Sequence, residues 1–349
     1  MKSIQFVILN PVAGNSIINM SETYFVTGAQ GFIGSWVIKA LVERGDVAVV
    51  FDRSDDPRRL SAVMDGDALS RIRFVTGDIT DRRAVGAALE SSGARRVIHL
   101  AGLQVPTCRA DPIAGAMVNV VGTLNVFESA RATGAERVVY ASSAAVFGMS
   151  DDGAPLDESA AHAPTTHYGV FKQSNEGNAR VYYLDHGLSS VALRPYTVYG
   201  VGRDTGLTSD PTKAMKSAIL NRPFHIRFGG ATDFQYVADT AAAFLACADR
   251  APTGAYVFNL HGETTEVAQM VRVIDEALPP HQRGLVTFGG APIPVALRLS
   301  DAAIRATVGA VPSTPLAEGV RETIKRFTEL RDEGRLDTSD IDTERSAKP

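Results

Sequence analysis

Short apolar segments of strand length alternate with longer segments of helical periodicity through the first half of the chain. The apolar segments are almost continuously hydrophobic, which is typical of strands covered by helices on both faces of a sheet. Alternation of such strands with helices predicts βαβ units and a parallel sheet. We predict strands at residues 23–26, 47–51, 72–75, 96–100, 137–141, 191–193 and 256–260.

The second half of the chain has longer connections that are rich in Gly, Pro and Thr. We interpret residues 197–336 mainly as a smaller substrate-binding lobe, with the strand at 256–260 returning to the main sheet. The loops of this lobe are expected at residues 198–211 and 229–232, and its short helices at 213–221 and 237–249.

The two ends of the chain are expected to lie outside the folded core. Residues 4–9 are apolar, but Asn10 and Pro11 end this segment, and a membrane span needs about 20 residues. The small-residue cleavage site of a secretory signal is also missing. Residues 1–19, which precede Met20, are predicted to be an extension dispensable for activity, with an extra edge strand as the alternative. The polar residues 337–349 are predicted to form a frayed tail.

Three glycines spaced three apart, Gly28, Gly31 and Gly34, lie where the first strand passes into a helix. Such glycines permit a tight turn, close approach of the backbone to a pyrophosphate, and close packing of the helix, whose N-terminus receives phosphate. The next strand ends at Asp52, whose carboxylate can accept hydrogen bonds from an adenosine ribose diol. This favours NAD as the cofactor, although neighbouring Arg53 leaves some use of NADP open. A strand-end aspartate in a solvated turn is the alternative.

Tyr168 and Lys172 lie four residues apart in a predicted helix and therefore share one face. A phenol becomes a base only when positive charge favours the phenolate, and Lys172 with an oxidised nicotinamide would supply that charge. Ser142 and Ser143 follow the strand at 137–141, at the edge where open α/β sheets bind ligands, so Ser143 can hydrogen-bond the reacting oxygen. Each pattern alone also fits a core tyrosine or a serine turn.

Taken in order, these motifs resemble the extended short-chain dehydrogenase/reductase family, which includes nucleotide-sugar epimerases and dehydratases. The resemblance extends over about residues 22–330. It implies an α/β fold with a Rossmann-type doubly wound parallel sheet at 20–196 and a smaller C-terminal substrate-binding lobe. The ordered motifs are Gly28 to Gly34, Asp52, Gly77-Asp78-Ile79, His99-Leu100-Ala101-Gly102, Ser142-Ser143, Tyr168, Lys172 and Arg194-Pro195.

The resemblance also implies roles for individual residues. Ser143, Tyr168 and Lys172 would be catalytic, and Lys172 would also hold the nicotinamide ribose of NAD. Asn119 matches a family asparagine of the central helix, where a structural role is expected. The remaining cofactor contacts would come from the glycine motif with Phe32 and Ile33, from Asp52 and Arg53, from Asp78 and Ile79 beside the adenine, from Leu100, Ala101 and Gly102, and from Pro195 and Val198.

The substrate is harder to assign from the sequence. Nucleotide-sugar members of the family usually have an asparagine at the position of Thr197 and an arginine at that of Thr232. A threonine hydroxyl cannot replace a guanidinium on a diphosphate. We therefore expect NAD-dependent oxidation of a secondary alcohol in a small sugar, sugar acid or hydroxy acid. The main alternative is a nucleotide-sugar (UDP-sugar) 4-epimerase with tightly bound NAD.

Two further alternatives are a non-catalytic NAD-binding sensor and a structural protein, which would leave the complete catalytic set unexplained. The loop at 200–211 offers hydroxyl groups, one arginine and a helix start, with Ser209 as the expected cap and Pro211 in the first turn. Substrate contacts are expected among Ser142, Ser143, Thr197, Arg203, Thr208, His225 and Arg227.

The composition indicates which classes of partner to expect. Hydrophobic residues make up 45% and charged residues 21%, and the net charge is −4, which gives no basic field for nucleic acid or anionic lipid. Cys108 and Cys247 have neither metal-ligand spacing nor a disulfide framework, so no metal is expected and a reducing cytoplasm fits. Relatives often dimerise through the Tyr/Lys helix and the helix at 114–133, so a homodimer is expected. Its contacts would come from Ala114, Ala116, Val120, Leu124 and Phe127.

Overall fold

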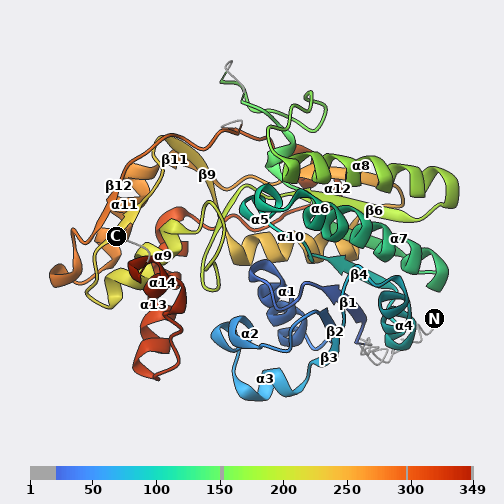
Figure 1. Cartoon of the computed structure of the whole chain (residues 1–349), viewed down its shortest axis with the longest axis horizontal. Helices are drawn as coiled ribbons and strands as arrows, with labels where there is room; N and C mark the ends of the chain where they lie inside the picture. Colours follow the sequence, from blue (N-terminus) through green and yellow to red (C-terminus); the bar gives the residue numbers. More distant parts are fainter. Residues whose placement is uncertain (1–20, 150–152, 296–297, 347–349) are drawn as a thin grey trace, which may run out of the picture.

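A seven-stranded parallel sheet forms the centre of the computed structural model, which describes residues 21–149, 153–295 and 298–346 (Figure 1). The strand order is β10-β6-β5-β4-β1-β2-β3, so the chain winds outward in both directions from the middle of the sheet. Each predicted strand is confirmed to within two residues. The strands are β1 (Thr23–Thr27), β2 (Val47–Asp52), β3 (Arg73–Thr76), β4 (Arg96–His99), β5 (Arg137–Ala141), β6 (Ser189–Arg194) and β10 (Ala255–Asn259).

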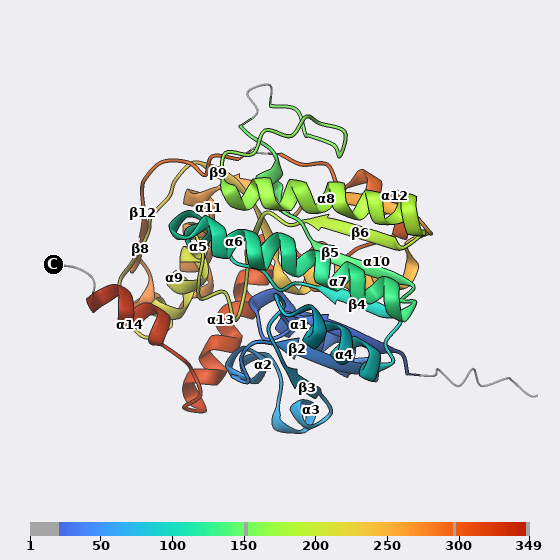
Figure 2. The ribbon, with the colours of Figure 1, turned by 45° about the vertical axis from the view of Figure 1, so that its right-hand side comes forward.

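Helices cover both faces of the sheet, as the continuous hydrophobicity of the strands predicts (Figure 2). Successive side chains of β1 serve the two faces, because Tyr24 and Val26 pack in one core cluster and Phe25 in the other. One face carries α4 (Arg82–Ser92), α7 (Gly122–Thr133) and α8 (His167–His186), and the other carries α1 (Phe32–Glu43) and α10 (Val237–Arg250). Helix α10 is thus part of the main domain, and its predicted place in the smaller lobe is wrong.

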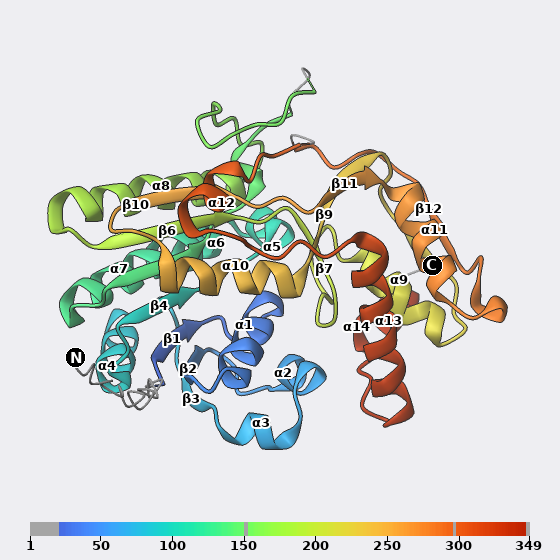
Figure 3. The same cartoon turned by 180° about the vertical axis from the view of Figure 1, so that it is seen from behind.

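The smaller lobe lies beside one end of the sheet (Figure 3). It contains a three-stranded sheet of β7 (Thr197–Tyr199), β9 (Ala231–Tyr236) and β11 (Glu263–Glu266), and a two-stranded sheet of β8 (Phe224–Ile226) and β12 (Val286–Phe288). Its main helices are α9 (Asp210–Ile219), α11 (Val267–Ala277) and α13 (Leu316–Asp332). The shorter described helices are α2 (Arg58–Val63), α3 (Gly66–Ser70), α5 (Val105–Ala110), α6 (Pro112–Ala116), η1 (Met117–Val121), η2 (Ala144–Val146), η3 (Pro280–Gln282), α12 (Ala302–Val308) and α14 (Ser339–Ser346).

One described stretch of helix, Pro112–Thr133, is long and apolar enough to cross a membrane by length and composition alone. Half of its most apolar window is buried inside the protein, where its helices pack against α4, α8 and the sheet. A core helix has the same composition, so this stretch is weak evidence for a membrane span.

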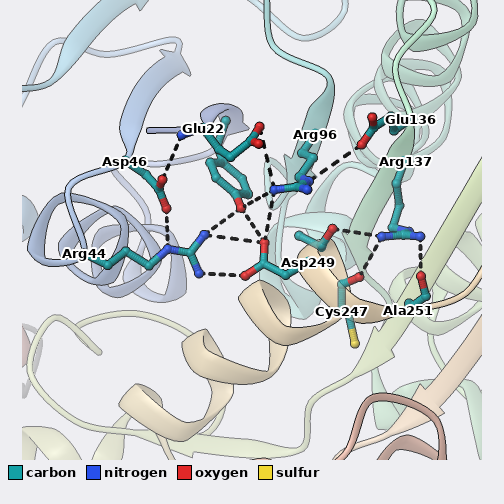
Figure 4. Close-up of polar contacts among 11 residues, drawn as sticks. Glu22, Arg44, Asp46, Arg96, Glu136, Arg137, Cys247, Asp249 and Ala251 are labelled. Atoms are coloured by element: carbon teal, nitrogen blue, oxygen red, sulfur yellow. Dashed lines mark hydrogen bonds and ion pairs between the residues drawn. The ribbon is translucent and has the colours of Figure 1, made fainter. Parts of the chain in front are cut away.

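A charged network fixes α10 at the edge of the sheet where the strands begin (Figure 4). Asp249 of α10 pairs with Arg44 at 2.7 Å and accepts a hydrogen bond from the Tyr24 hydroxyl. Burial, followed by the contact with Asp249, raises the pKa of Tyr24 to about 12, so its proton stays in place at neutral pH. Arg137 donates to carbonyl oxygens at the end of α10, including that of Ala248 at 2.9 Å. The network therefore anchors the helix far from the carboxyl ends of the strands.

The C-terminal residues are more ordered than the sequence predicts. Residues 339–346 form α14, in which the Asp340 carboxylate pairs with Lys216 at 2.8 Å and Ile341 is 3% exposed. The predicted frayed tail is therefore wrong for this part. Polarity suggested fraying, whereas the lysine that pairs with Asp340 lies on α9, far away in the sequence. Residues 1–19, predicted to be dispensable, lie outside the described residues.

Truncation after Leu336 is expected to lower the free energy of unfolding by about 2 kcal/mol, because the burial of Ile341 is lost. Chemical denaturation of the two chains measures this difference. Glu333→Ala, which removes only an exposed ion pair with Arg335, is the control and should change stability by less than about 1 kcal/mol. Equal midpoints for the truncated and full-length chains would contradict the prediction.

Candidate active site

A cavity of about 270 Å³ opens at the carboxyl ends of the central strands. The structure brings most of the predicted site residues to this cavity, although their roles stay predictions. Its lining includes Gly28, Gly31, Phe32, Ile33, Gly34, Leu100, Gly102, Ser142, Ser143, Tyr168, Lys172, Pro195, Thr197, Val198, Arg203 and Thr208.

The glycine turn is packed too closely for side chains. Gly28 has φ of +65°, and a Cβ atom on it would lie 2.4 Å from the backbone nitrogen of Ala101. A Cβ atom on Gly34 would lie 2.3 Å from the carbonyl oxygen of Gly28. Helix α1 begins at Phe32 after Gly31 with no side-chain cap, so its first N–H groups remain available to an anion. This turn fits the pyrophosphate of a dinucleotide.

The predicted adenosine contacts continue along the strand ends outside the lining of the cavity. The Asp52 carboxylate accepts hydrogen bonds from the backbone N–H groups of Gln30 at 3.1 Å and Arg53 at 2.8 Å. Asp78 accepts from both the backbone and the hydroxyl of Thr80, which lowers the pKa of its carboxyl. Beside Asp52, the buried Oε1 atom of Gln30 has no hydrogen-bond partner among the described residues. An anionic edge with an unsatisfied acceptor fits a ribose diol, which donates hydrogen bonds.

Tyr168 and Lys172 lie one turn apart in α8, which Thr166 caps by accepting from the Gly169 N–H at 3.0 Å. The Lys172 Nζ atom donates to the Ala141 carbonyl at 2.6 Å and lies 5.5 Å from the centre of the Tyr168 ring. The Ser143 hydroxyl lies close enough to the Tyr168 hydroxyl to lower the pKa of the phenol. The predicted catalytic residues therefore form one connected group.

The charges of this group depend on burial. Burial raises the pKa of Tyr168 above its ordinary value of 10, and the hydrogen bond from Ser143 opposes this effect. Burial lowers the pKa of Lys172 to about 8, so most of Lys172 is charged at neutral pH. Tyr168 thus starts as a neutral phenol, and added positive charge beside it is needed to favour the phenolate.

Two predicted site residues serve structure. The Asn119 side chain exchanges two hydrogen bonds with the backbone of Leu103, at 2.7 and 2.9 Å, within the π-helical turn η1, in agreement with its expected structural role. The Ser142 hydroxyl donates to the Glu176 carboxylate, so it is already engaged. Ala101 and Ile79 are not among the residues that line the cavity.

The structure does not bring His225 and Arg227 to the cavity. His225 lies on β8 and hydrogen-bonds Thr287 at 2.9 Å, and Arg227 pairs with the buried Asp210 carboxylate at 2.6 Å. Asp210, the first residue of α9, holds Arg227 by an ion pair that sequence spacing does not reveal. Ser209 also differs from expectation, because its hydroxyl donates to the Gly206 carbonyl and caps no helix N–H group.

Sequence analysis missed the apolar wall of the cavity, which is formed by Tyr196, Leu207, Ile293 and Val295. The Tyr196 hydroxyl donates to the Val295 carbonyl at 3.3 Å, which holds the two parts of this wall together. The segment around Ile293 and Val295 is an irregular loop with no motif, so only the folded structure brings it to the site. Gln104 and Val105, also missed, complete the wall near α5.

Residues 200–206, which we name the strap, pack against α1 and α2, the two helices that follow β1 and β2. The Trp36 indole N–H donates to the Val201 carbonyl at 2.9 Å. Arg59 makes two hydrogen bonds to the Asp204 carboxylate, at 2.9 and 2.8 Å, and a third to the Gln30 carbonyl at 3.2 Å. The strap therefore joins the smaller lobe to the cofactor side of the cleft.

Comparison with known proteins agrees with this geometry. The NAD dependent epimerase/dehydratase family matches residues 24–260. UDP-glucuronate 4-epimerase 4 of Arabidopsis thaliana is 28% identical over 342 residues, which cover 88% of this chain and 76% of that protein. UDP-glucose 4-epimerase of Streptomyces lividans is 30% identical over 275 residues, with 73% and 80% coverage.

Solved structures show the same similarity. UDP-glucose 4-epimerase of Thermus thermophilus in complex with NAD has a TM-score of 0.76 at 25% identity, covering 87% of this chain and 98% of that one. MoeE5 in complex with UDP-glucuronic acid and NAD has a TM-score of 0.74 at 27% identity, with 88% and 99% coverage. The chain therefore belongs to the NAD dependent epimerase/dehydratase family of extended short-chain dehydrogenases/reductases.

Proposed function

We propose that the chain is a nucleotide-sugar 4-epimerase that retains its NAD. The strap carries this proposal, because Trp36 and the paired hydrogen bonds of Arg59 hold it beside the cofactor side of the cavity, which its Arg203 lines. An epimerase returns the hydride to its substrate and needs no exchange of cofactor, so a firmly held strap suits it, whereas a dehydrogenase must release its cofactor in every turnover. Three of the four proteins compared above are UDP-sugar 4-epimerases, which supports the alternative from the sequence over its first hypothesis, oxidation of a free sugar or hydroxy acid.

The catalytic residues would act on one sugar carbon. NAD, held at the glycine turn and Asp52, would supply reversible hydride transfer at that carbon. Tyr168 removes the hydroxyl proton, Ser143 hydrogen-bonds the same oxygen, and charged Lys172 favours the phenolate. The oxidised sugar would then rotate and present the opposite face of that carbon. Return of the hydride to this face, with return of the proton by Tyr168, would give the other epimer.

Arg203 supports an anionic substrate. It lines the cavity, its Nη2 atom donates to Thr208 at 3.0 Å, and its buried Nε atom has no partner among the described residues. Burial lowers the pKa of Arg203 to about 10, which still leaves it charged at neutral pH. A carboxylate or phosphate would satisfy this guanidinium, so a UDP-uronate is the first substrate to test.

Arg203→Met is expected to raise KM for UDP-glucuronate by about 10- to 100-fold, because a charge-assisted hydrogen bond is lost. Steady-state kinetics with UDP-glucuronate and UDP-glucose measure the effect, and UDP-glucose should be less affected. Arg83→Met, on the exposed side of α4, is the control. Weaker binding of NAD with an unchanged substrate KM would instead make Arg203 a cofactor ligand.

A net dehydrogenase acting on a compact hydroxy acid is the second candidate. Thr197 and Thr232 are both 1% exposed and hydrogen-bond each other at 3.0 Å, so they place no cation beside the cavity. Among the described residues that line it, Lys172 and Arg203 are the only cations. This is a small positive charge for a nucleotide diphosphate, and it favours a smaller anion.

Incubation of the purified protein with UDP-sugars, and separately with free sugars and sugar acids plus NAD, distinguishes the two candidates. A 4-epimer formed from a UDP-sugar without net NADH is the expected result. Stoichiometric NADH from a free acid would replace the proposal with the dehydrogenase. If the protein binds NAD but forms neither a 4-epimer nor NADH from any substrate, the non-catalytic NAD-binding sensor would be favoured.

We also propose a homodimer formed through α8 and the helical stretch 112–133. These segments lie side by side on one surface and expose apolar side chains, with Ile113 76%, Val181 52% and Leu184 66% exposed. Of the contacts named from the sequence, Phe127 is wholly buried against the sheet and is not available.

Light scattering should give about twice 37.1 kDa for the wild-type chain. Leu184→Glu is expected to dissociate the dimer, because a charge would have to be buried in the interface. Glu90→Lys on α4 is the control for a change of surface charge. A wild-type mass of a single chain would contradict the homodimer.

A further inference from the structure

A buried ion pair lies behind the cavity, one helical turn beyond Lys172. Arg194, at the end of β6, donates to the two carboxylate oxygens of Glu176 at 2.9 and 2.7 Å. The side chains are 2% and 6% exposed, and the Arg194 guanidinium lies 4.8 Å from the centre of the Phe147 ring. Removing two charges from water is costly, and a hydrophobic pair is often at least as stable. A role in placing its neighbours would explain the pair better than stability does.

One neighbour is the strand end that carries Ser143. The Ser142 hydroxyl donates to Glu176, and the Ser142 N–H donates to the Leu193 carbonyl at 2.7 Å. Ser142 is thus held on two sides, by α8 and by β6. Since Ser143 is the next residue, the place of its hydroxyl follows from this attachment.

The other neighbour is the loop that leads into Tyr168. Arg194 donates to the His162 ring at 2.6 Å and to Asn259 at 3.3 Å. Asn259 in turn holds the same loop, since its side chain donates to the Leu156 carbonyl at 3.1 Å and its N–H donates to Glu158 at 2.8 Å. The loop ends at the cap of α8, so the pair also bears on the first turn of the catalytic helix.

We propose that Glu176 and Arg194 are positioning residues that set the place of Ser143 relative to Tyr168. Neither touches the substrate. Glu176 acts through Ser142 on the strand end, and Arg194 acts through His162 and Asn259 on the loop before α8. This inference rests on the proposed proton transfer by Tyr168.

Ser142→Ala is the most direct test, because it removes one link and leaves the ion pair intact. Ser190→Ala is the matched control. Ser190 lies on the adjacent strand β6, is 1% exposed, and has a hydroxyl with no partner among the described residues. Both variants delete one buried hydroxyl, so they differ in the link to Glu176.

Two measurements follow each variant. Ser142→Ala should lower kcat for the epimerised sugar about tenfold with KM almost unchanged, since loss of one aligning hydrogen bond affects the reacting geometry. In the NAD-bound protein with carbon-13 at the tyrosine Cζ positions, the Tyr168 signal, assigned by Tyr168→Phe, should show about tenfold less phenolate at a given pH. Ser190→Ala should leave both quantities at wild-type values.

A double-mutant cycle with Glu176→Gln completes the test. If Glu176 acts through Ser142, the double variant is no slower than Glu176→Gln alone. Should Glu176→Gln fail to fold, Ser142→Ala still decides the matter. Wild-type kcat and an unchanged Tyr168 titration in Ser142→Ala would overturn the inference. Absence of turnover in the wild type would count against the proposed function instead. The Tyr168 titration, compared between Ser142→Ala and the wild type, would still test the positioning role.

Discussion

Tyr168→Phe is expected to lower kcat by about 10²- to 10⁴-fold, the usual contribution of a positioned acid or base. The ring stays in α8 and only the hydroxyl that meets Ser143 is lost. Binding of NAD should change little, because the glycine turn and Asp52 are untouched. Rates of epimer formation and titration with NAD measure the two effects. Tyr182→Phe is the control, since Tyr182 lies on the same helix but hydrogen-bonds Glu128 at 2.9 Å.

The pH dependence should follow from the same group. Below about pH 8 Lys172 carries its charge and favours the phenolate of Tyr168. As the pH rises past that value the ammonium loses its proton, and its help to Tyr168 is lost. The rate should rise with pH as the phenolate of Tyr168 forms, and in Lys172→Met, which lacks the ammonium, this rise in kcat should begin at higher pH than in the wild type. An unchanged profile in that variant would remove Lys172 from the proton transfer.

Gly28→Ala is expected to destabilise the fold by about 2–4 kcal/mol and to abolish measurable NAD binding. The added Cβ atom would lie within 2.4–2.7 Å of the backbone of Leu100 and Ala101, and backbone atoms cannot swing away as side chains do. The end of β4 would have to move from β1, which opens the turn that receives the pyrophosphate. Denaturation and NAD titration measure the two losses.

Gly134→Ala separates the backbone strain of a positive φ from the steric contact of the added Cβ atom. Gly134 has φ of +68°, close to that of Gly28, but a Cβ atom there meets nothing within 4 Å. It should cost about 1 kcal/mol, the penalty of a left-handed backbone for alanine, and leave NAD binding unchanged. Similar losses for the two variants would show that the close contact at Gly28 is unimportant.

The sheet, and the meeting of Ser143, Tyr168 and Lys172 at one cavity, were predictable because their signals are local. Uninterrupted apolar segments such as 47–51 indicate buried strands, and Tyr168 and Lys172 share a helix face through their spacing alone. The sequence did not predict which part of the protein each helix packs against. The amphipathic pattern of α10 indicates a helix with one buried face, but it does not say whether the main sheet or the smaller lobe covers that face.

The same limit applies to polar partners. Arg227 and Arg203 look alike in the sequence, yet Asp210 holds one of them away from the cavity while the other lines it. Arg194 entered the sequence analysis only as part of a motif, because its partners Glu176, His162 and Asn259 come from three separate segments. Interactions over such separations follow from the packing of the whole chain.

The strap links the lifetime of the protein in the cell to the supply of NAD. Trp36 and Arg59 hold the strap beside the cofactor side of the cavity, so we expect bound NAD to leave slowly while those bonds persist. A ligand that binds only the folded chain stabilises it in proportion to the logarithm of its free concentration. Cells short of NAD would then accumulate empty chains that unfold and are degraded sooner. The abundance of this enzyme would follow the cofactor supply, as well as the rate of its synthesis.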